Sequence, residues 1–125
     1  MEAAATDRTF PKAERLCGKR DIATLMAEGR RGGSGCLRYC CLSPNGLTHS
    51  RILVSVPKKY FKRAVRRNLL KRRIREAWRL EKGLLLSPDD GRSCDILFTY
   101  VAPDVRSYEE IRAALIAILL EISQK

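Results

Sequence analysis

The chain has a single histidine, His49, and its 14 acidic residues are scattered, which leaves little from which to build a catalytic centre. A catalytic Cys-His or Ser-His pair would have His49 as its one candidate base, and the sequence shows no evident third residue to orient that histidine. A two-metal nuclease needs several carboxylates that converge on rigid elements. Instead, Asp89 and Asp90 fall in an expected loop, and Glu109 and Glu110 suit the N-terminus of an expected helix. We therefore expect no catalytic residue and no metal site in the protein itself.

The sequence also lacks CxxC pairs and long apolar runs. Its cysteines are Cys17, Cys36, Cys40, Cys41 and Cys94, and no second ligand pair or histidine cluster completes a zinc site around them. We expect free, buried thiols in a reducing cytosol. The longest apolar run, residues 113–120, is too short to span a bilayer, and the N-terminus has no apolar segment typical of a signal peptide. These features predict a cytoplasmic protein.

Positive charge is what the sequence has in excess. The net charge is +11, and 12 of the 25 basic residues lie between positions 58 and 82, together with only two acids. Such clustering is typical of proteins that bind nucleic acid or an anionic membrane surface. The length of 125 residues, with 45% hydrophobic content, suits one globular domain. We expect a flexible tail over residues 1–9 and a single RNA-binding domain over residues 10–125.

The first half of the chain predicts a helix and two strands. Asp21 is a candidate cap for a short helix with apolar positions at Ile22, Leu25 and Met26, which Gly29 ends. The following RRGGSG segment reads as a flexible, basic loop that lacks the Lys-Ser/Thr pair of a phosphate-binding loop. Strands are expected over residues 36–42 and 51–57, and the Asn-Gly turn between them allows a hairpin.

The second half predicts helix, strand and helix. The basic segment is helical from about Val65 to Lys82, residues 94–102 form an apolar, buried strand, and Ser107 with Glu110 forms a capping box that opens a helix over residues 108–122. The order helix-strand-strand-helix-strand-helix indicates an α+β fold, a two-layer α/β sandwich with helices packed on one small sheet.

The basic helix sorts into two faces when residues are placed at 100° intervals. Its apolar half contains Val65, Leu69, Leu70, Ile74, Ala77 and Leu80. The other side carries Asn68, Lys71, Arg72, Arg75, Arg79 and Lys82. This stripe contains no acid at i,i+4 spacing, whereas a merely solvated face would intersperse acids. Arginine suits phosphate recognition, and the scarcity of aromatics argues against base stacking, so we expect backbone contacts to structured RNA.

The segment AVRRNLLKRRIRE resembles the signature of the bacterial ribonuclease P protein subunit. In that pattern an Arg-Asn pair is followed by Lys-Arg and then by Arg-Glu. FPKAERL near the start, VSVPKK before the basic helix, and CDILF before the last helix are similar to that family, in its order. One position departs, because Leu69 stands where the family usually has arginine.

The resemblance implies a sheet with a left-handed strand-helix-strand crossover, where general handedness rules would favour a right-handed one. It implies a subunit of a ribonuclease P holoenzyme that removes the 5′ leader of precursor tRNA. The catalytic RNA would do the chemistry and hold the Mg²⁺, and the protein alone would bind no cofactor. The implied RNA-binding residues are Lys58, Lys59, Arg63, Arg66, Arg67, Asn68, Lys71, Arg72, Arg75 and Arg79.

The family also implies a cleft between the first helix and the sheet that holds the single-stranded leader. Its candidate residues are Ile22, Met26, Tyr39, Cys40, Arg51 and Ser55, with Arg51, Lys58 and Lys59 on the rim. Ile22 and Met26 stand where family members commonly have aromatic residues. The alternative is that both are ordinary core residues.

Three other functions compete with this one. A structured-RNA-binding, ribosome-associated protein with no processing role would share the charge stripe. A membrane-surface protein is disfavoured, because the apolar half of the helix is needed for the core. A helix-turn-helix DNA reader is disfavoured, because residues 51–57 read as a strand, so no DNA partner is expected.

Overall fold

The computed structural model describes residues 14–43, 45, 49–85 and 93–123. Four strands form one mixed sheet in the order β1-β2-β4-β3. Strand β1 (Arg30–Ser34) pairs antiparallel with β2 (Leu37–Leu42), and β2 pairs antiparallel with β4 (Asp95–Tyr100). Strand β3 (Arg51–Ser55) pairs parallel with β4. Strand β4, part of the apolar segment 94–102 that the sequence predicts as a buried strand, therefore has a neighbouring strand on each side.

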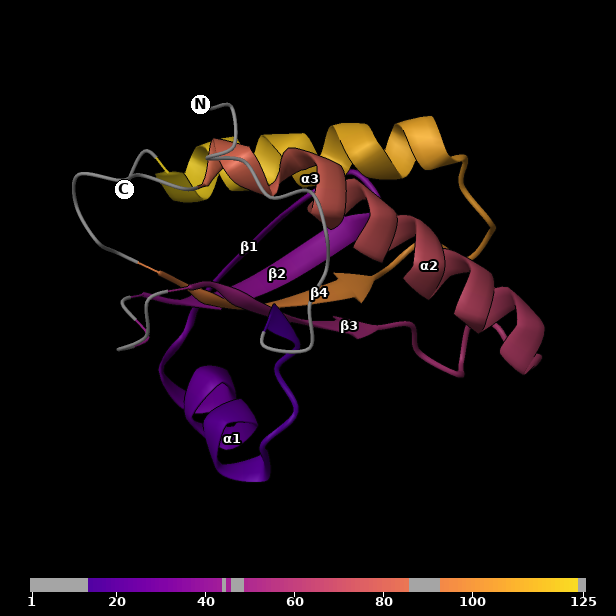
Figure 1. Cartoon of the computed structure of the whole chain (residues 1–125). Helices are drawn as coiled ribbons and strands as arrows, with labels where there is room; N and C mark the ends of the chain where they lie inside the picture. The colour runs from indigo at the N-terminus through magenta and orange to yellow at the C-terminus, as the bar shows by residue number, and fades with distance from the viewer. Residues whose placement is uncertain (1–13, 44, 46–48, 86–92, 124–125) are drawn as a thin grey trace.

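The helices cover both faces of the sheet (Figure 1). Helix α2 (Ala64–Glu81), which continues into the short 3₁₀ turn η3 (Lys82–Leu84), lies with α3 (Tyr108–Ser123) on one face. Helix α1 (Lys19–Glu28) lies alone on the other. Because α2 joins the parallel neighbours β3 and β4, the unit β3-α2-β4 is the strand-helix-strand crossover that the resemblance implies.

Alternation along the strands divides the core into two unequal parts. The larger part lies under α2 and α3, where Phe98 of β4 meets Trp78 of α2 at a ring-centroid distance of 6.4 Å. The smaller part lies under α1 and consists of Leu16, Leu25 and Cys40, with partly buried apolar neighbours. The face under α1 is thus only thinly covered, which matters for the site described below.

Three expectations about local structure are wrong. Residues 30–34 form β1 rather than a loop, since antiparallel pairing with β2 stabilises a segment that has no apolar alternation of its own. Strands β2 and β3 form no hairpin, because β4 lies between them. Asp21 does not cap α1, since the helix begins two residues earlier with Gly18 as N-cap.

Other expectations are confirmed. Helix α1 ends at Gly29, whose backbone N–H donates to the carbonyl of Leu25. The hydroxyl of Ser107 accepts a hydrogen bond from the N–H of Glu110 at 3.2 Å, which is one half of the expected capping box. The tail over residues 1–9, the turn positions 44 and 46–48, and the loop with Asp89 and Asp90 lie outside the described residues.

Candidate nucleic-acid interface

Helix α2 turns one face to the core and the other to solvent, as its sequence predicts. The prediction is wrong for Lys82, which was assigned to the basic stripe but lies in η3, is 3% exposed and donates to both carboxylate oxygens of Glu14 at 2.9 Å. Leu70, Ile74, Ala77 and Trp78 are buried. Val65 was predicted on the apolar half but is 79% exposed, because the first turn of α2 extends past the sheet (Figure 1). Of the ten predicted RNA-binding residues, the exposed ones are Lys58, Lys59, Arg63, Arg66, Asn68, Arg72 and Arg75, and the half-buried ones are Arg67, Lys71 and Arg79.

The basic stripe surrounds a shallow hollow of about 340 Å³ on α2 itself. The hollow is lined by Asn68, Arg72, Arg75, Glu76 and Arg79. The expectation of an acid-free stripe is therefore wrong at this point: Glu76 accepts two hydrogen bonds from Arg79, at 2.9 and 2.7 Å. These hydrogen bonds lower the pKa of Glu76 below its usual value. The exposed positive charge of the hollow therefore comes from Arg72 and Arg75.

Arg67 has a structural task that the sequence did not reveal. Its Nη1 donates to the carbonyl oxygens of Phe61 and Lys62, at 2.8 and 2.9 Å. It therefore fastens the turn before α2 to the first turns of the helix. Arg73 is similarly engaged, because its Nη1 donates to the carbonyl of Arg106 at 2.6 Å.

A second surface lies on the opposite side of the sheet, next to α1. Here a groove of about 710 Å³ is bordered by the C-terminal part of α1 and by strands β1, β2 and β4. Met26, Cys40, Leu97 and Thr99 are among its lining residues, and Arg31 and Arg38 bring positive charge to it. The groove thus combines an apolar floor with a basic border, on the face that the core leaves thinly covered.

The predicted cleft residues divide between this groove and other places. Met26 lines the groove and is 40% exposed, whereas Ile22 packs against the small core under α1. Cys40 lies in the groove floor, but the hydroxyl of Tyr39 donates to Glu121 of α3 at 2.7 Å, on the other face of the sheet. Tyr39 therefore borders the groove by its backbone and cannot offer its ring. Ser55, on β3, is not among the lining residues, and neither are Lys58 and Lys59, which were predicted for the rim.

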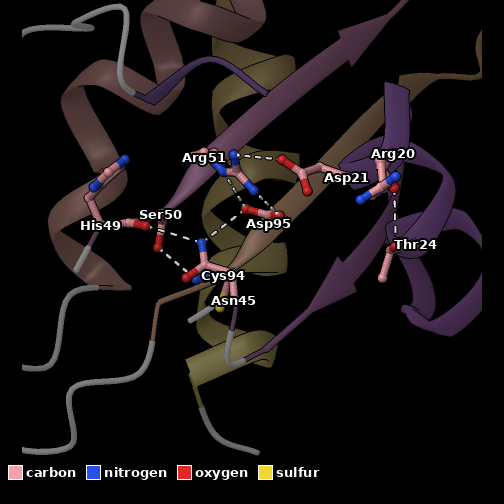
Figure 2. A network of polar contacts seen from close by, with 9 residues as sticks. All are labelled: Arg20, Asp21, Thr24, Asn45, His49, Ser50, Arg51, Cys94 and Asp95. Atoms are coloured by element: carbon pink, nitrogen blue, oxygen red, sulfur yellow. Dashed lines mark hydrogen bonds and ion pairs between the residues drawn. The ribbon is translucent and has the colours of Figure 1, made fainter. Parts of the chain in front are cut away.

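Arg51 does not form the rim that was predicted for it (Figure 2). Its Nε and Nη2 donate to both carboxylate oxygens of Asp95 at 2.9 and 2.7 Å, and its Nη1 donates to Asp21 at 3.1 Å. Asn45 adds a hydrogen bond to Asp95 at 2.9 Å. The bond to buried Asp95 is the main reason that the pKa of Arg51 is raised. The basic border instead comes from Arg31 and Arg38. Arg31 lies on β1, which the sequence did not predict, whereas Arg38 lies on the predicted strand two residues before Cys40, so strand alternation could have found it.

The cysteines are free, as expected, although Cys17 is exposed rather than buried. The hydrogen bond between the Cys41 and Cys94 thiols, together with burial, raises the pKa of Cys41. Over the described residues, no group of three or more His, Cys, Asp or Glu side chains could hold a metal ion. In the same part of the chain, no helix is long and apolar enough to cross a membrane.

Comparisons with known proteins agree on one family. A family model described as Ribonuclease P matches residues 10–123. The ribonuclease P protein component of Porphyromonas gingivalis is 36% identical over 116 residues, which cover 90% of this chain and 85% of that protein. The structure of the Staphylococcus aureus RNase P protein aligns with a TM-score of 0.73 at 25% identity, covering 90% of this chain and 97% of that one. The RNase P protein from Thermotoga maritima aligns with a TM-score of 0.72 at 26% identity, covering 86% and 96%. The chain therefore belongs to the ribonuclease P protein family.

Proposed function

We propose that this subunit binds two RNAs in the cytoplasm, the catalytic RNA of ribonuclease P and the 5′ leader of precursor tRNA. The α2 stripe binds the catalytic RNA, and the groove beside α1 binds the leader. The holoenzyme then removes the leader by endonucleolytic hydrolysis. The chemistry belongs to the RNA and its Mg²⁺, and no protein side chain acts as a catalyst.

The observation that carries this proposal is the placement of two basic surfaces on opposite faces of one sheet. The α2 stripe lies outside the large core, and the groove with Arg31 and Arg38 lies beside α1. Each phosphate that a basic side chain neutralises releases counterions and favours binding. Since the two surfaces do not overlap, one RNA on each can be held at the same time.

The two surfaces suit different kinds of RNA. The stripe is arginine-rich and contains no aromatic side chain among its exposed residues, which favours contacts to the backbone of a folded RNA. The groove has an apolar floor that includes Met26 and Leu97. A single strand presents unstacked bases as well as phosphates, so it gains from an apolar floor beside basic side chains.

Met26 is the position that tests the groove. In the reconstituted holoenzyme, Met26→Ala should weaken binding of precursor tRNA more than binding of mature tRNA, which has no leader. Thermal unfolding should change little, because a half-exposed side chain leaves no large cavity when it is truncated. Leu120→Ala is a matched control, since Leu120 is a similarly exposed apolar residue on α3. Equal losses of affinity for both tRNAs, or a large loss of thermal stability, would mean that Met26 is a core residue and not part of a leader-binding groove.

A further inference from the structure

Helix α1 is held to the sheet by few apolar contacts. Of its ten residues only Leu25 is buried, in the small cluster with Leu16 and Cys40. A helix with so little buried surface gains little from packing alone. Its position over the groove therefore depends more than usual on polar contacts.

Those polar contacts lie at the two ends of the helix. At the C-terminal end, Cys40 Sγ donates to the carbonyl of Leu25 at 3.3 Å, and Arg31 Nη2 donates to the carbonyl of Met26 at 2.9 Å. At the N-terminal end, Asp21 accepts from Arg51 Nη1 at 3.1 Å (Figure 2). Met26, whose side chain lines the groove, is itself part of the C-terminal attachment, and Asp21 lies at the other end of the same helix.

Arg51 is a rigid point of attachment. Its guanidinium is fixed by two hydrogen bonds to Asp95, whose side chain is buried, and Asn45 holds the same carboxylate. Residues Arg51 and Asp95 are also direct neighbours in the parallel register of β3 and β4. The carboxylate of Asp21, half-exposed on the first turn of α1, is thus the more exposed of the two carboxylates that hold Arg51.

We propose that Asp21 is a positioning residue for leader binding. Its hydrogen bond to Arg51 sets the position of α1 over the sheet, and thereby the shape of the groove in which Met26 stands. This inference rests on the function proposed above. Asp21 itself touches no RNA, and Arg51, each of whose three nitrogens donates to a carboxylate, is an anchor rather than a phosphate ligand.

Electrostatics alone predicts the opposite effect. A carboxylate near a bound polyanion is repulsive, so its removal should tighten binding of every RNA. The two explanations can be separated because an asparagine side chain removes the charge but keeps an oxygen that can accept from Arg51. Alanine removes both the charge and the acceptor.

The experiment compares Asp21→Ala with Asp21→Asn in the holoenzyme, by the ratio of the Kd for mature tRNA to the Kd for precursor tRNA. We expect Asp21→Ala to reduce the preference for precursor by about two- to five-fold, the range of an exposed ion pair. Asp21→Asn should keep most of the preference. Glu28→Ala, which removes an exposed acid from the other end of α1, should leave the preference unchanged.

Several outcomes would overturn the inference. If both Asp21 variants bind all RNAs more tightly and to the same extent, the residue acts by charge alone. If both keep the wild-type preference, α1 does not need the bond to Arg51. A wild-type holoenzyme with no preference for precursor would instead contradict the proposed function, so the two failures can be told apart.

Discussion

Individual basic residues of this protein differ in whether their charge is available to a partner. Arg51 is bound to two carboxylates, Arg67 to two carbonyl oxygens, and Arg79 to Glu76. Arg72 and Arg75 are exposed in the hollow on α2. The sequence presents all five as equivalent positive charges. Only the folded arrangement separates those that stabilise the protein from those that can meet phosphate.

Asp95 should be the most sensitive acid of the described chain. It is 3% exposed and accepts two hydrogen bonds from Arg51 and one from Asn45. Asp95→Ala should lower the free energy of unfolding by about 3 kcal/mol, because it removes one partner of a largely buried ion pair. Urea denaturation measures this. Asp104→Ala, which breaks the exposed pair with Arg106, should lower the free energy of unfolding far less, because solvent screens that pair. Similar losses for the two variants would contradict this account.

Tyr39 should make the protein sensitive to high pH. Burial, together with the hydrogen bond to Glu121, raises the pKa of its phenol from 10.0 to about 12. Below pH 10 the phenol is neutral in both states. Between pH 10 and about 12 it ionises only in the unfolded chain, so the free energy of unfolding should fall by up to about 1.4 kcal/mol per pH unit. The test is to measure the free energy of unfolding against pH for the wild-type protein and for Tyr39→Phe. The variant should lack this part of the decline, and identical profiles for the two proteins would contradict the prediction.

At the level of elements, α2 is both a core helix and the main basic surface. Replacement of Arg72 and Arg75 by alanine should weaken binding to ribonuclease P RNA and lower the salt slope by up to about two, since two phosphate contacts are lost. Stability should change little because both side chains are exposed. The matched control is Arg106→Ala with Arg112→Ala, which removes the same charge from outside α2. An equal loss in the control would mean that net charge, rather than α2, determines binding.

The elements differ in how well the sequence predicts them. Helical periodicity predicted the core face of α2 except at Val65, and a nearly continuous apolar run predicted the buried strand β4. Strand β1 was missed, since RRGGS has no apolar alternation and becomes a strand only by pairing with β2. The false hairpin has a similar cause: the turn allowed it, and only the insertion of β4 excludes it. Because β1 was missed, Arg31 could not be predicted on the basic border, whereas Arg38 lies on the predicted strand β2 and shares a face with Cys40.

Over the whole molecule, one sheet separates two surfaces that the proposal assigns to two RNAs. The large core under α2 and α3 supports the stripe. The core under α1 is small, so the position of α1 beside the groove depends on polar contacts. Substitutions in the stripe should weaken binding of the catalytic RNA. They should therefore reduce the binding of precursor tRNA and of mature tRNA by the same factor. Variants of the groove should act on the leader alone.

The most direct test of this account is cleavage of precursor tRNA at low magnesium concentration by the catalytic RNA, with and without the protein. The protein should restore cleavage that the RNA alone performs poorly, because its positive charge replaces counterions between the two RNAs. The Arg72→Ala, Arg75→Ala variant should restore it less well at equal protein concentration. Cleavage of precursor tRNA by the purified protein free of RNA, or full activity of the RNA without the protein, would contradict the account.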